Sequence, residues 1–323
     1  MFEELKIGWR YFLRTWPQVC LRTRWYGFFA LGAILYWGVI FGFSLIFKSS
    51  TITWVLFFLG LGGAVLIYRF FKQQVFSILE ANYLAVLVEL ATHEKVPVTK
   101  FQIRFSRKKV TQKFGNRQRI YDAYVRLHKS LNEILVASPF PLKMGAPFND
   151  QSFFFRKTWQ KIWRKIWFVD LFLNMKYMTA LLISHCFIKK DEILWENLRE
   201  SLILCAQNFK KIYKSSVYIY LLTILFSAAY FMVLLPPLLG LSMFLPSLKL
   251  YFLISAFIMT WAFKKILLDS FALATLVSEF RKIVEGQSPD PQWDKRLAGI
   301  SKYFFEIKRR AIYWEHAQRP VYD

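Results

Sequence analysis

Four long runs of this sequence contain no ionised side chain, and they limit the available folds more than any other feature. The runs cover residues 25–47, 49–68, 215–248 and 250–263. A helix needs about 20 apolar residues to cross the hydrocarbon core of a bilayer, so the first three runs are long enough. The fourth is long enough if its helix begins near Phe244 and Lys249 extends to the surface; a re-entrant segment is the alternative. The sequence therefore predicts an all-α integral membrane protein with four transmembrane helices in two hairpins.

The composition agrees with a membrane protein and excludes other classes. Hydrophobic residues make up 55% of the 323 residues and charged residues 20%, which is too apolar for an intrinsically disordered chain. The three cysteines, Cys20, Cys186 and Cys205, are too few and too far apart for a disulfide scaffold. We expect no cleavable signal sequence, because residues 1–24 are amphipathic rather than apolar.

The basic side chains are distributed unevenly around the four runs. The chain holds 44 Lys and Arg against 21 Asp and Glu, for a formal net charge of +23. The short links within the two pairs of runs hold only Lys48 and Lys249, and every other Lys and Arg lies in the termini or the central segment. Because cytoplasmic loops collect Lys and Arg, we predict that both termini and the centre are cytoplasmic. This bias fits a bacterial inner membrane.

The same distribution of charge argues against a fifth span at residues 166–188. This stretch is apolar overall but contains Asp170, Asn174, Lys176 and His185. If it crossed the membrane, one of its strongly basic flanks would lie outside. We therefore expect an interfacial helix or a helix buried in a bundle.

Two segments combine tryptophans with cations, a pattern typical of helices that lie in the plane of a membrane surface. The first covers residues 1–24, with Trp9 and Trp16 as anchors and with Pro17 expected to end the helix. The second covers 153–167, and a core helix with one solvated face is its alternative. Its expected anchors and lipid-facing cations are Trp159, Trp163, Trp167, Lys161, Arg164 and Lys165.

The region 72–150 is expected to form only a small cytoplasmic cap, since an aqueous stretch of this length cannot build a large core. Apolar and polar residues alternate over 101–105, which predicts a short strand. The pattern over 118–137 predicts an amphipathic helix. A basic surface for anionic lipid or an acidic partner is predicted between them, with a plain solvated loop as the other interpretation. It consists of Arg104, Arg107, Lys108, Lys109, Lys113, Arg117 and Arg119.

These features recur along the chain in an order that suggests duplication. The predicted segments are 1–24, 25–71, 72–150, 151–214, 215–265 and 266–323. An amphipathic segment, a pair of apolar runs and a Leu-rich helix occur twice, with similar endings at 84–90 and 274–280. A weak tandem repeat explains this order, and chance resemblance between Leu-rich helices is the alternative.

Small residues and prolines within the apolar runs suggest helix contacts and a break. Pairs of small residues four apart let two helices approach closely, either within this chain or with another subunit. The pairs are Gly38 with Gly42 and Gly60 with Ala64. Pro236 and Pro237 interrupt the third run, so we expect a hairpin turn there. A hinge for a substrate gate is the alternative.

No motif typical of catalysis or metal binding occurs. The four histidines do not form a zinc-protease pattern, no two cysteines are close in sequence, and there is no phosphate-binding glycine loop. We therefore expect no cofactor, no metal and no enzymatic activity. An enzyme would require several groups to converge in one pocket, namely Asp170, His185, Glu80, Glu89 and Asp269.

The leading functional hypothesis is a non-enzymatic membrane subunit that assembles a larger membrane complex through its basic surface and small-residue faces. The alternative is a transporter or flippase for a lipid or an anionic solute. Ion coupling is not expected, because the four runs contain no ionisable group that could hold a driving ion. Expected partners are anionic lipids and other protein subunits or a second copy. Nucleic acid is not expected, because no RNA-binding motif accompanies the basic stretch.

Overall fold

The computed structural model describes residues 2–47, 50–93, 96–97, 100–137, 168–188 and 193–318. All regular structure in these ranges is helical, which confirms the all-α prediction for them. The α-helices are α1 (Phe2–Arg14), α2 (Trp16–Phe47), α3 (Ser50–Phe71), α4 (Ser77–His93), α5 (Lys100–Phe114), α6 (Arg117–Ala137), α8 (Phe168–His185), α9 (Leu194–Gln207), α10 (Phe209–Phe244), α11 (Lys249–Phe263), α12 (Asp269–Val284), α13 (Pro291–Ile300) and α14 (Lys302–Gln318). Two π-helices, η1 (Lys72–Phe76) and η4 (Lys264–Leu268), and a 3₁₀ helix, η3 (Pro246–Leu248), complete the described elements.

Four helical stretches are long and apolar enough to cross a membrane, as the sequence predicts. They are Trp16–Phe43, Thr51–Thr92, Phe209–Phe244 and Pro246–Val284. The second runs from α3 through η1 into α4, and the fourth runs from α11 through η4 into α12. A helix of about 40 residues is roughly 60 Å long, about twice the thickness of a hydrocarbon core. Each of these two stretches is therefore long enough to cross such a layer and to continue beyond it.

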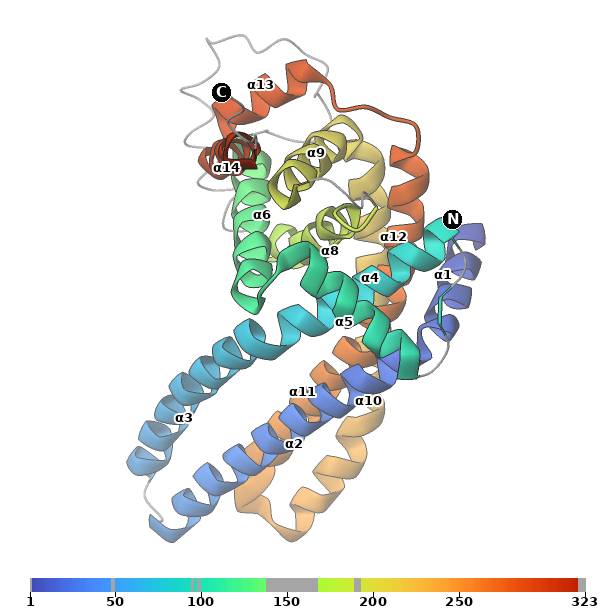
Figure 1. Ribbon diagram of the computed structural model, residues 1–323. Helices are drawn as coiled ribbons and strands as arrows, with labels where there is room; N and C mark the ends of the chain where they lie inside the picture. The colour runs from blue at the N-terminus through green and yellow to red at the C-terminus, as the bar shows by residue number, and fades with distance from the viewer. Residues whose placement is uncertain are drawn as a thin grey trace.

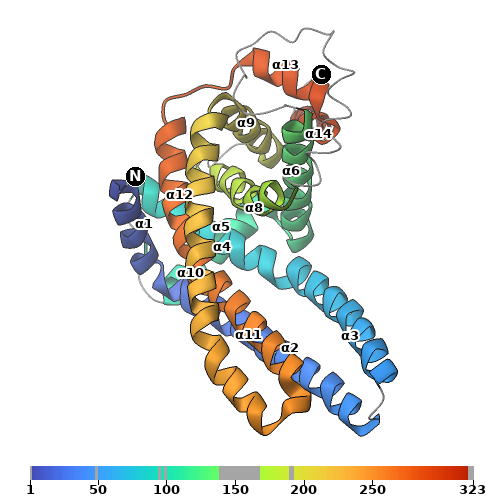
Figure 2. The same cartoon turned by 180° about the vertical axis from the view of Figure 1, so that it is seen from behind.

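The four long helices extend from one side of a helical cap (Figure 1). Helix α2 packs against both α3 and α11, and α10 packs against α11. Both views place α3 on the other side of α2 from α10 (Figures 1 and 2). Large apolar side chains are exposed along all four helices, including Leu35, Phe58, Leu225 and Phe257. An apolar outer surface of this kind is suited to lipid rather than to water.

The cap consists of α4, α5, α6, α8, α9, α12, α13 and α14, with the first part of α10 (Figure 2). Helix α8 lies in its interior and packs against α4, α6, α9 and α12. This position agrees with the bundle-buried alternative for residues 166–188, of which 168–188 are described. One hydrophobic core joins Leu84, Leu127, Leu181, Leu198 and Leu276, all of which are buried. The expectation of a small cap is wrong, because both halves of the chain contribute helices to this core.

Two predictions about local structure in the first half are corrected. The alternating residues 101–105 belong to α5 and form no strand. Gln102, Ser106 and Val110 recur every four residues on the buried face, and this helical period prevails over the short alternation. The N-terminal amphipathic helix ends at Arg14, before the expected proline. Pro17 instead lies in the first turn of α2, where no backbone N–H donor is needed.

The expected break at Pro236 and Pro237 is also wrong. Both prolines lie inside α10, which continues to Phe244, and the chain turns at η3. Continuing the helix keeps the remaining backbone groups paired, which matters most where no water is available. The two prolines are exposed on the surface of the helix, so they mark no turn.

Candidate functional site

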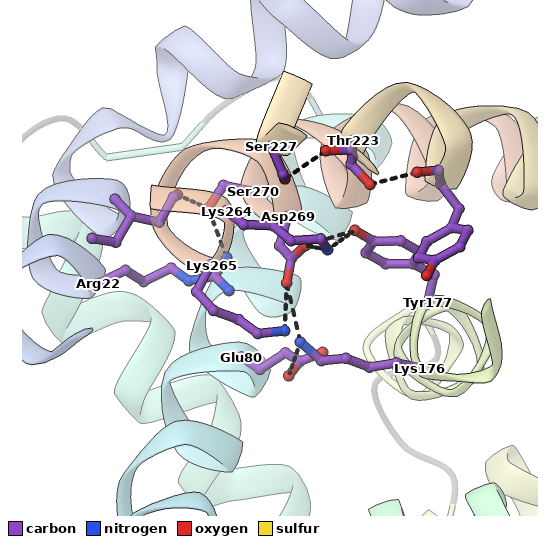
Figure 3. A network of polar contacts seen from close by, with 12 residues as sticks. Arg22, Glu80, Lys176, Tyr177, Thr223, Ser227, Lys264, Lys265, Asp269 and Ser270 are labelled. Atoms are coloured by element: carbon purple, nitrogen blue, oxygen red, sulfur yellow. Dashed lines mark hydrogen bonds and ion pairs between the residues drawn. The ribbon is translucent and has the colours of Figure 1, made fainter. Parts of the chain in front are cut away.

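Charged side chains meet inside the protein at the level where the long helices enter the cap (Figure 3). The two π-helices mark this level, and π-helical turns are rare features that often occur at functional sites. We call this group the junction cluster. It consists of Arg22 from α2, Glu80 from α4, Lys176 from α8, Lys264 and Lys265 from η4, and Asp269 from α12.

Asp269 lies at the centre of the junction cluster, and its side chain is only 1% exposed. Lys264 Nζ lies 2.8 Å from its Oδ1, Lys265 Nζ lies 2.8 Å from its Oδ2, and Lys176 Nζ lies 3.3 Å from the same Oδ2. The Tyr177 hydroxyl donates to Oδ1 at 2.6 Å. One carboxylate therefore faces three ammonium groups, and charge-assisted bonds of this kind hold α8, η4 and α12 together.

Lys176 connects Asp269 to a second buried carboxylate. Its Nζ lies 3.9 Å from Glu80 Oε2, while Glu80 Oε1 has no hydrogen-bond partner within the described residues. Burial lowers the pKa of Lys176, but the nearby carboxylates of Glu80 and Asp269 outweigh it, so the pKa stands well above its ordinary value. Burial and the Asp269 carboxylate likewise raise the pKa of Tyr177 well above its ordinary value. At neutral pH Lys176 is thus charged and Tyr177 is a hydrogen-bond donor.

Arg22 lies beside these groups and is 1% exposed. Its Nη1 donates to Ser270 Oγ at 2.7 Å, and its guanidinium lies over the rings of Tyr83 and Tyr26, 5.0 and 5.7 Å from their centroids. Its Nε and Nη2 have no hydrogen-bond partner within the described part of the chain. An unpaired buried donor costs about 1–3 kcal/mol, so this edge of Arg22 is unusual.

The junction cluster carries more positive than negative charge. Its members are four cations and two carboxylates. Buried ionised groups are stable only when they are paired, so an excess of cations favours the entry of an anion. Within the described ranges, no group of three or more His, Cys, Asp and Glu has a spacing suited to a metal ion. The chemistry that this arrangement offers is anion binding.

An apolar groove of about 770 Å³ lies between α2, α3 and α11. This volume is within the range of about 300–1,000 Å³ that is typical of ligand pockets. Aromatic side chains form most of its lining. The lining residues are Phe28, Phe29, Gly32, Ala33, Tyr36, Trp37, Ala64, Ile67, Tyr68, Phe71, Phe257, Ile258 and Trp261.

Aromatic contacts connect the groove with the junction cluster. Phe29 and Trp261 line the groove, and both lie within 6.3 Å of the Phe76 ring in η1. Tyr26 stacks on Phe76 with ring centroids 4.4 Å apart, and the Arg22 guanidinium lies 5.7 Å from the centroid of the Tyr26 ring. Along α11 and η4, Trp261 precedes the lysines of the cluster by one turn. Ring contacts through Phe76 and Tyr26 therefore link the groove to Arg22.

The predicted basic surface is only partly a surface. Arg104, Arg107 and Lys108 on α5 and Arg117 and Arg119 on α6 are exposed. Two further members of that set, Lys109 and Lys113, are partly buried, and Lys109 forms an ion pair with Glu89. Trp9 and Trp16 are exposed, as membrane anchors would be. The remaining predicted anchors and cations lie outside the described residues, namely Trp159, Trp163, Trp167, Lys161, Arg164 and Lys165.

The small-residue positions face different surroundings. A Cβ added at Gly38 would lie 3.4 Å from the Tyr251 hydroxyl of α11, and one added at Gly60 would clash with Ile40 of α2. A Cβ at Gly42 would meet nothing within 4 Å. The fourth of these residues, Ala64, lines the groove. Gly38 and Gly60 therefore serve helix contacts within this chain.

The groups named for an enzyme do not converge. Glu80 and Asp269 do meet around Lys176, but Glu89 pairs with a lysine of α5. His185 packs edge-on against Phe280 inside the cap, and the side chain of Asp170 lies outside the described residues.

The cations of the junction cluster escaped the sequence-based prediction of sites. Arg22, Lys264 and Lys265 lie just beyond the apolar runs, where charges ordinarily set topology. The sequence did contain one indication that these charges meet, because Glu80 and Asp269 place carboxylates inside long apolar helices.

Comparison of the chain with models of protein families, with curated proteins and with solved structures gives no match. No residue role is therefore transferred from another protein. The function has to be argued from the junction cluster and the groove.

Proposed function

We propose that this chain is an integral membrane protein that binds and moves an anionic lipid. The lipid would place an apolar chain in the groove and its headgroup against the junction cluster. The observation that carries this proposal is the position of an aromatic-lined groove next to a buried cluster in which cations outnumber carboxylates. An amphiphile is the class of ligand that matches both surfaces. This proposal narrows the transporter alternative, which the sequence suggests, to a lipid.

The exposed residues at the rim of the groove support the proposal that a lipid enters it from the bilayer. Phe28 and Phe257 line the groove and are 66% and 60% exposed on the outer surface of the long helices. Inside an apolar layer, water does not fill such an opening, so acyl chains are its natural occupants. The four apolar runs contain no ionised side chain, so movement of the lipid would follow its concentration gradient rather than a coupled ion.

Gly32 provides a direct test, because it lines the groove and an added Cβ would meet no atom within 4 Å. We expect Gly32→Leu to fill part of the groove and to lower the amount of anionic lipid that stays with the purified protein. Gly42→Leu is the matched control, since it adds the same side chain to α2 at a position that is equally open but does not line the groove. Equal lipid content in the two variants and the wild type would refute the proposal.

We also propose that the cap and both termini are cytoplasmic, in a bacterial inner membrane. The support is the concentration of Lys and Arg on the cap side, with only Lys48 and Lys249 in the opposite links. Reporter fusions after residue 48, within η3 and at the C-terminus test this orientation. Activity of a periplasmic reporter at the C-terminus would contradict it.

A tandem repeat is a further part of the proposal. Each half contains a short helix, two long helices, a π-helix and then three more helices, in the order α1 to α6 and again α9 to α14. Each π-helix follows the second long helix of its half, at Lys72–Phe76 and Lys264–Leu268. Because π-helices are rare, their matching positions support duplication more strongly than the Leu-rich endings do. Repeats entering from one side would be related by an axis along the membrane normal.

The membrane-subunit hypothesis is the second candidate. One observation favours it, the exposed basic side chains of Arg104, Arg107, Lys108 and Arg117 on the outer face of the cap, which would suit an acidic protein surface. Mass spectrometry of intact complexes in mild detergent tests it. A stoichiometric partner released by charge reversal at Arg104 and Arg107 would support it, and a lone chain would count against it.

A further inference from the structure

We infer that the junction cluster is a binding site for a phosphomonoester, held by the unpaired edge of the buried Arg22 guanidinium. This inference rests on the proposed function and names the headgroup that the site would take. The same chemistry occurs on a lipid phosphate and on a soluble phosphate ester. The experiment below separates the two sources.

The unpaired, buried edge of Arg22 has the geometry of an anion fork. Nε and Nη2 lie side by side on one edge of the guanidinium plane, and their two N–H groups match two oxygens of one phosphate. The opposite edge is held by Ser270, which accepts from Nη1 at 2.7 Å. Ser270 is fixed in turn, because the Tyr83 hydroxyl donates to its carbonyl oxygen at 2.9 Å. The fork is therefore oriented before any ligand arrives, and its two donors have no hydrogen-bond partner within the described residues.

The charge of the site matches a dianion. With all six groups ionised, four cations against two carboxylates give an excess of two positive charges. A phosphomonoester carries about −1.5 to −2 near pH 7, whereas a phosphodiester carries a single negative charge. A diester would leave part of the excess uncompensated in a buried place, so the site should prefer the monoester.

The carboxylates that face the site do not compete with the fork. Asp269 is engaged by three ammonium groups and the Tyr177 hydroxyl, and Glu80 faces Lys176. Lys265 and Lys176 keep 13% and 37% of their side chains exposed. Their ammonium groups each have three donors, so both can turn a free N–H toward a phosphate that is held by Arg22.

The test measures headgroup preference in nanodiscs of phosphatidylcholine containing either phosphatidate or phosphatidylglycerol, matched for total negative charge. We expect the wild type to retain phosphatidate about 10- to 100-fold more tightly, the range given by one or two hydrogen bonds to a charged group. Arg22→Lys keeps the charge but removes the fork, and it should abolish this preference. Arg24→Gln is the control, because Arg24 is exposed on the same helix, and it should leave the preference unchanged.

A second arm uses wild-type protein alone and needs no folded variant. Inorganic phosphate should raise the melting temperature saturably in detergent, beyond the effect of chloride at equal ionic strength. Competition between inorganic phosphate and phosphatidate at comparable concentrations would assign the site to a soluble ester, and phosphatidate binding without such competition would assign it to a lipid. An unchanged preference in Arg22→Lys, or no response to phosphate in any form, overturns the inference.

The two proposals can fail separately. If Gly32→Leu lowers lipid content while Arg22→Lys leaves the headgroup preference intact, the groove binds lipid and the phosphomonoester site is wrong. If Arg22→Lys abolishes phosphate binding while Gly32→Leu has no effect on lipid, the anion site stands and the proposed lipid function is wrong.

Discussion

Replacing Asp269 by asparagine removes the charge at the centre of the junction cluster while keeping the shape of the side chain. The carboxylate accepts from Lys264, Lys265, Lys176 and Tyr177 at 2.6 to 3.3 Å. Without it, the one acidic partner that the described residues still offer the three lysines is Glu80, whose Oε2 lies 3.9 Å from Lys176. Breaking a buried ion pair by removing one partner costs about 3–5 kcal/mol. The lysines are 13% to 37% exposed, so water offsets part of the loss and we expect about 3 kcal/mol.

The assay is thermal unfolding in mild detergent, followed by the fluorescence of the 12 tryptophans. About 3 kcal/mol corresponds to a fall in melting temperature of roughly 4–5 °C for a chain of this size. Glu285→Gln is the control, because Glu285 is 70% exposed on the end of the same helix and its loss should cost under about 0.5 kcal/mol. Added phosphate should stabilise Asp269→Asn more than the wild type, since the excess positive charge is larger by one. A melting temperature equal to that of the control would refute the argument that this carboxylate holds the junction together.

Three further predictions concern other parts of the chain. A maleimide in mild detergent should label Cys20, which is exposed, and leave Cys186 and Cys205 unlabelled. The reason is that burial raises the pKa of both of these thiols to about 12. The number of labels is counted by mass spectrometry of the intact protein. Burial raises the pKa of Asp294, but hydrogen bonds and ion pairs with Arg and Lys outweigh it and hold that pKa below its ordinary value. The carboxylate should therefore stabilise the fold above about pH 4, and this contribution should be lost as pH falls through the folded pKa. The melting temperatures of Asp294→Asn and wild type should then converge in acid. Gly8→Ala places a methyl group against the side chain and Cα of Thr275 in α12, which should cost about 1–3 kcal/mol in the same melting assay.

Each of these has a contrary result. Three labelled cysteines before denaturation would contradict the buried positions of α8 and α9 in the cap. A constant difference between Asp294→Asn and wild type from neutral to acid pH would contradict the assigned ion pairs with Arg199 and Lys308. Gly27→Ala is the control for Gly8→Ala, since an added Cβ at Gly27 meets nothing within 4 Å, and equal melting temperatures for the two variants would contradict the contact of α1 with α12.

The long apolar helices were predictable because exclusion of charge from a stretch of about 20 residues is a local property of the sequence. The buried position of 168–188 was predictable because the strongly basic segments on both sides argue against a crossing. The size of the cap was not predictable in this way. Its core joins Leu84, Leu181 and Leu276 from three distant parts of the chain, and no local pattern states which apolar faces will meet.

The junction cluster illustrates the same limit for the site. Arg22 and Lys265 flank apolar runs and resemble charges that merely set topology. The fold turns them inward, because α2 and η4 meet beside α4 and α8 at the base of the cap. Pro236 shows the converse case. Proline locally favours a break, but the helix continues through it because a continuous helix keeps the remaining backbone groups hydrogen-bonded.

Electron cryo-microscopy of the full chain in nanodiscs that contain anionic lipid tests the central claim most directly. The account predicts density for an acyl chain between α2, α3 and α11 that continues to a headgroup at the Nε and Nη2 edge of Arg22. A groove closed by its own side chains, or filled by a helix of a partner protein with no density at Arg22, would contradict the proposed lipid function.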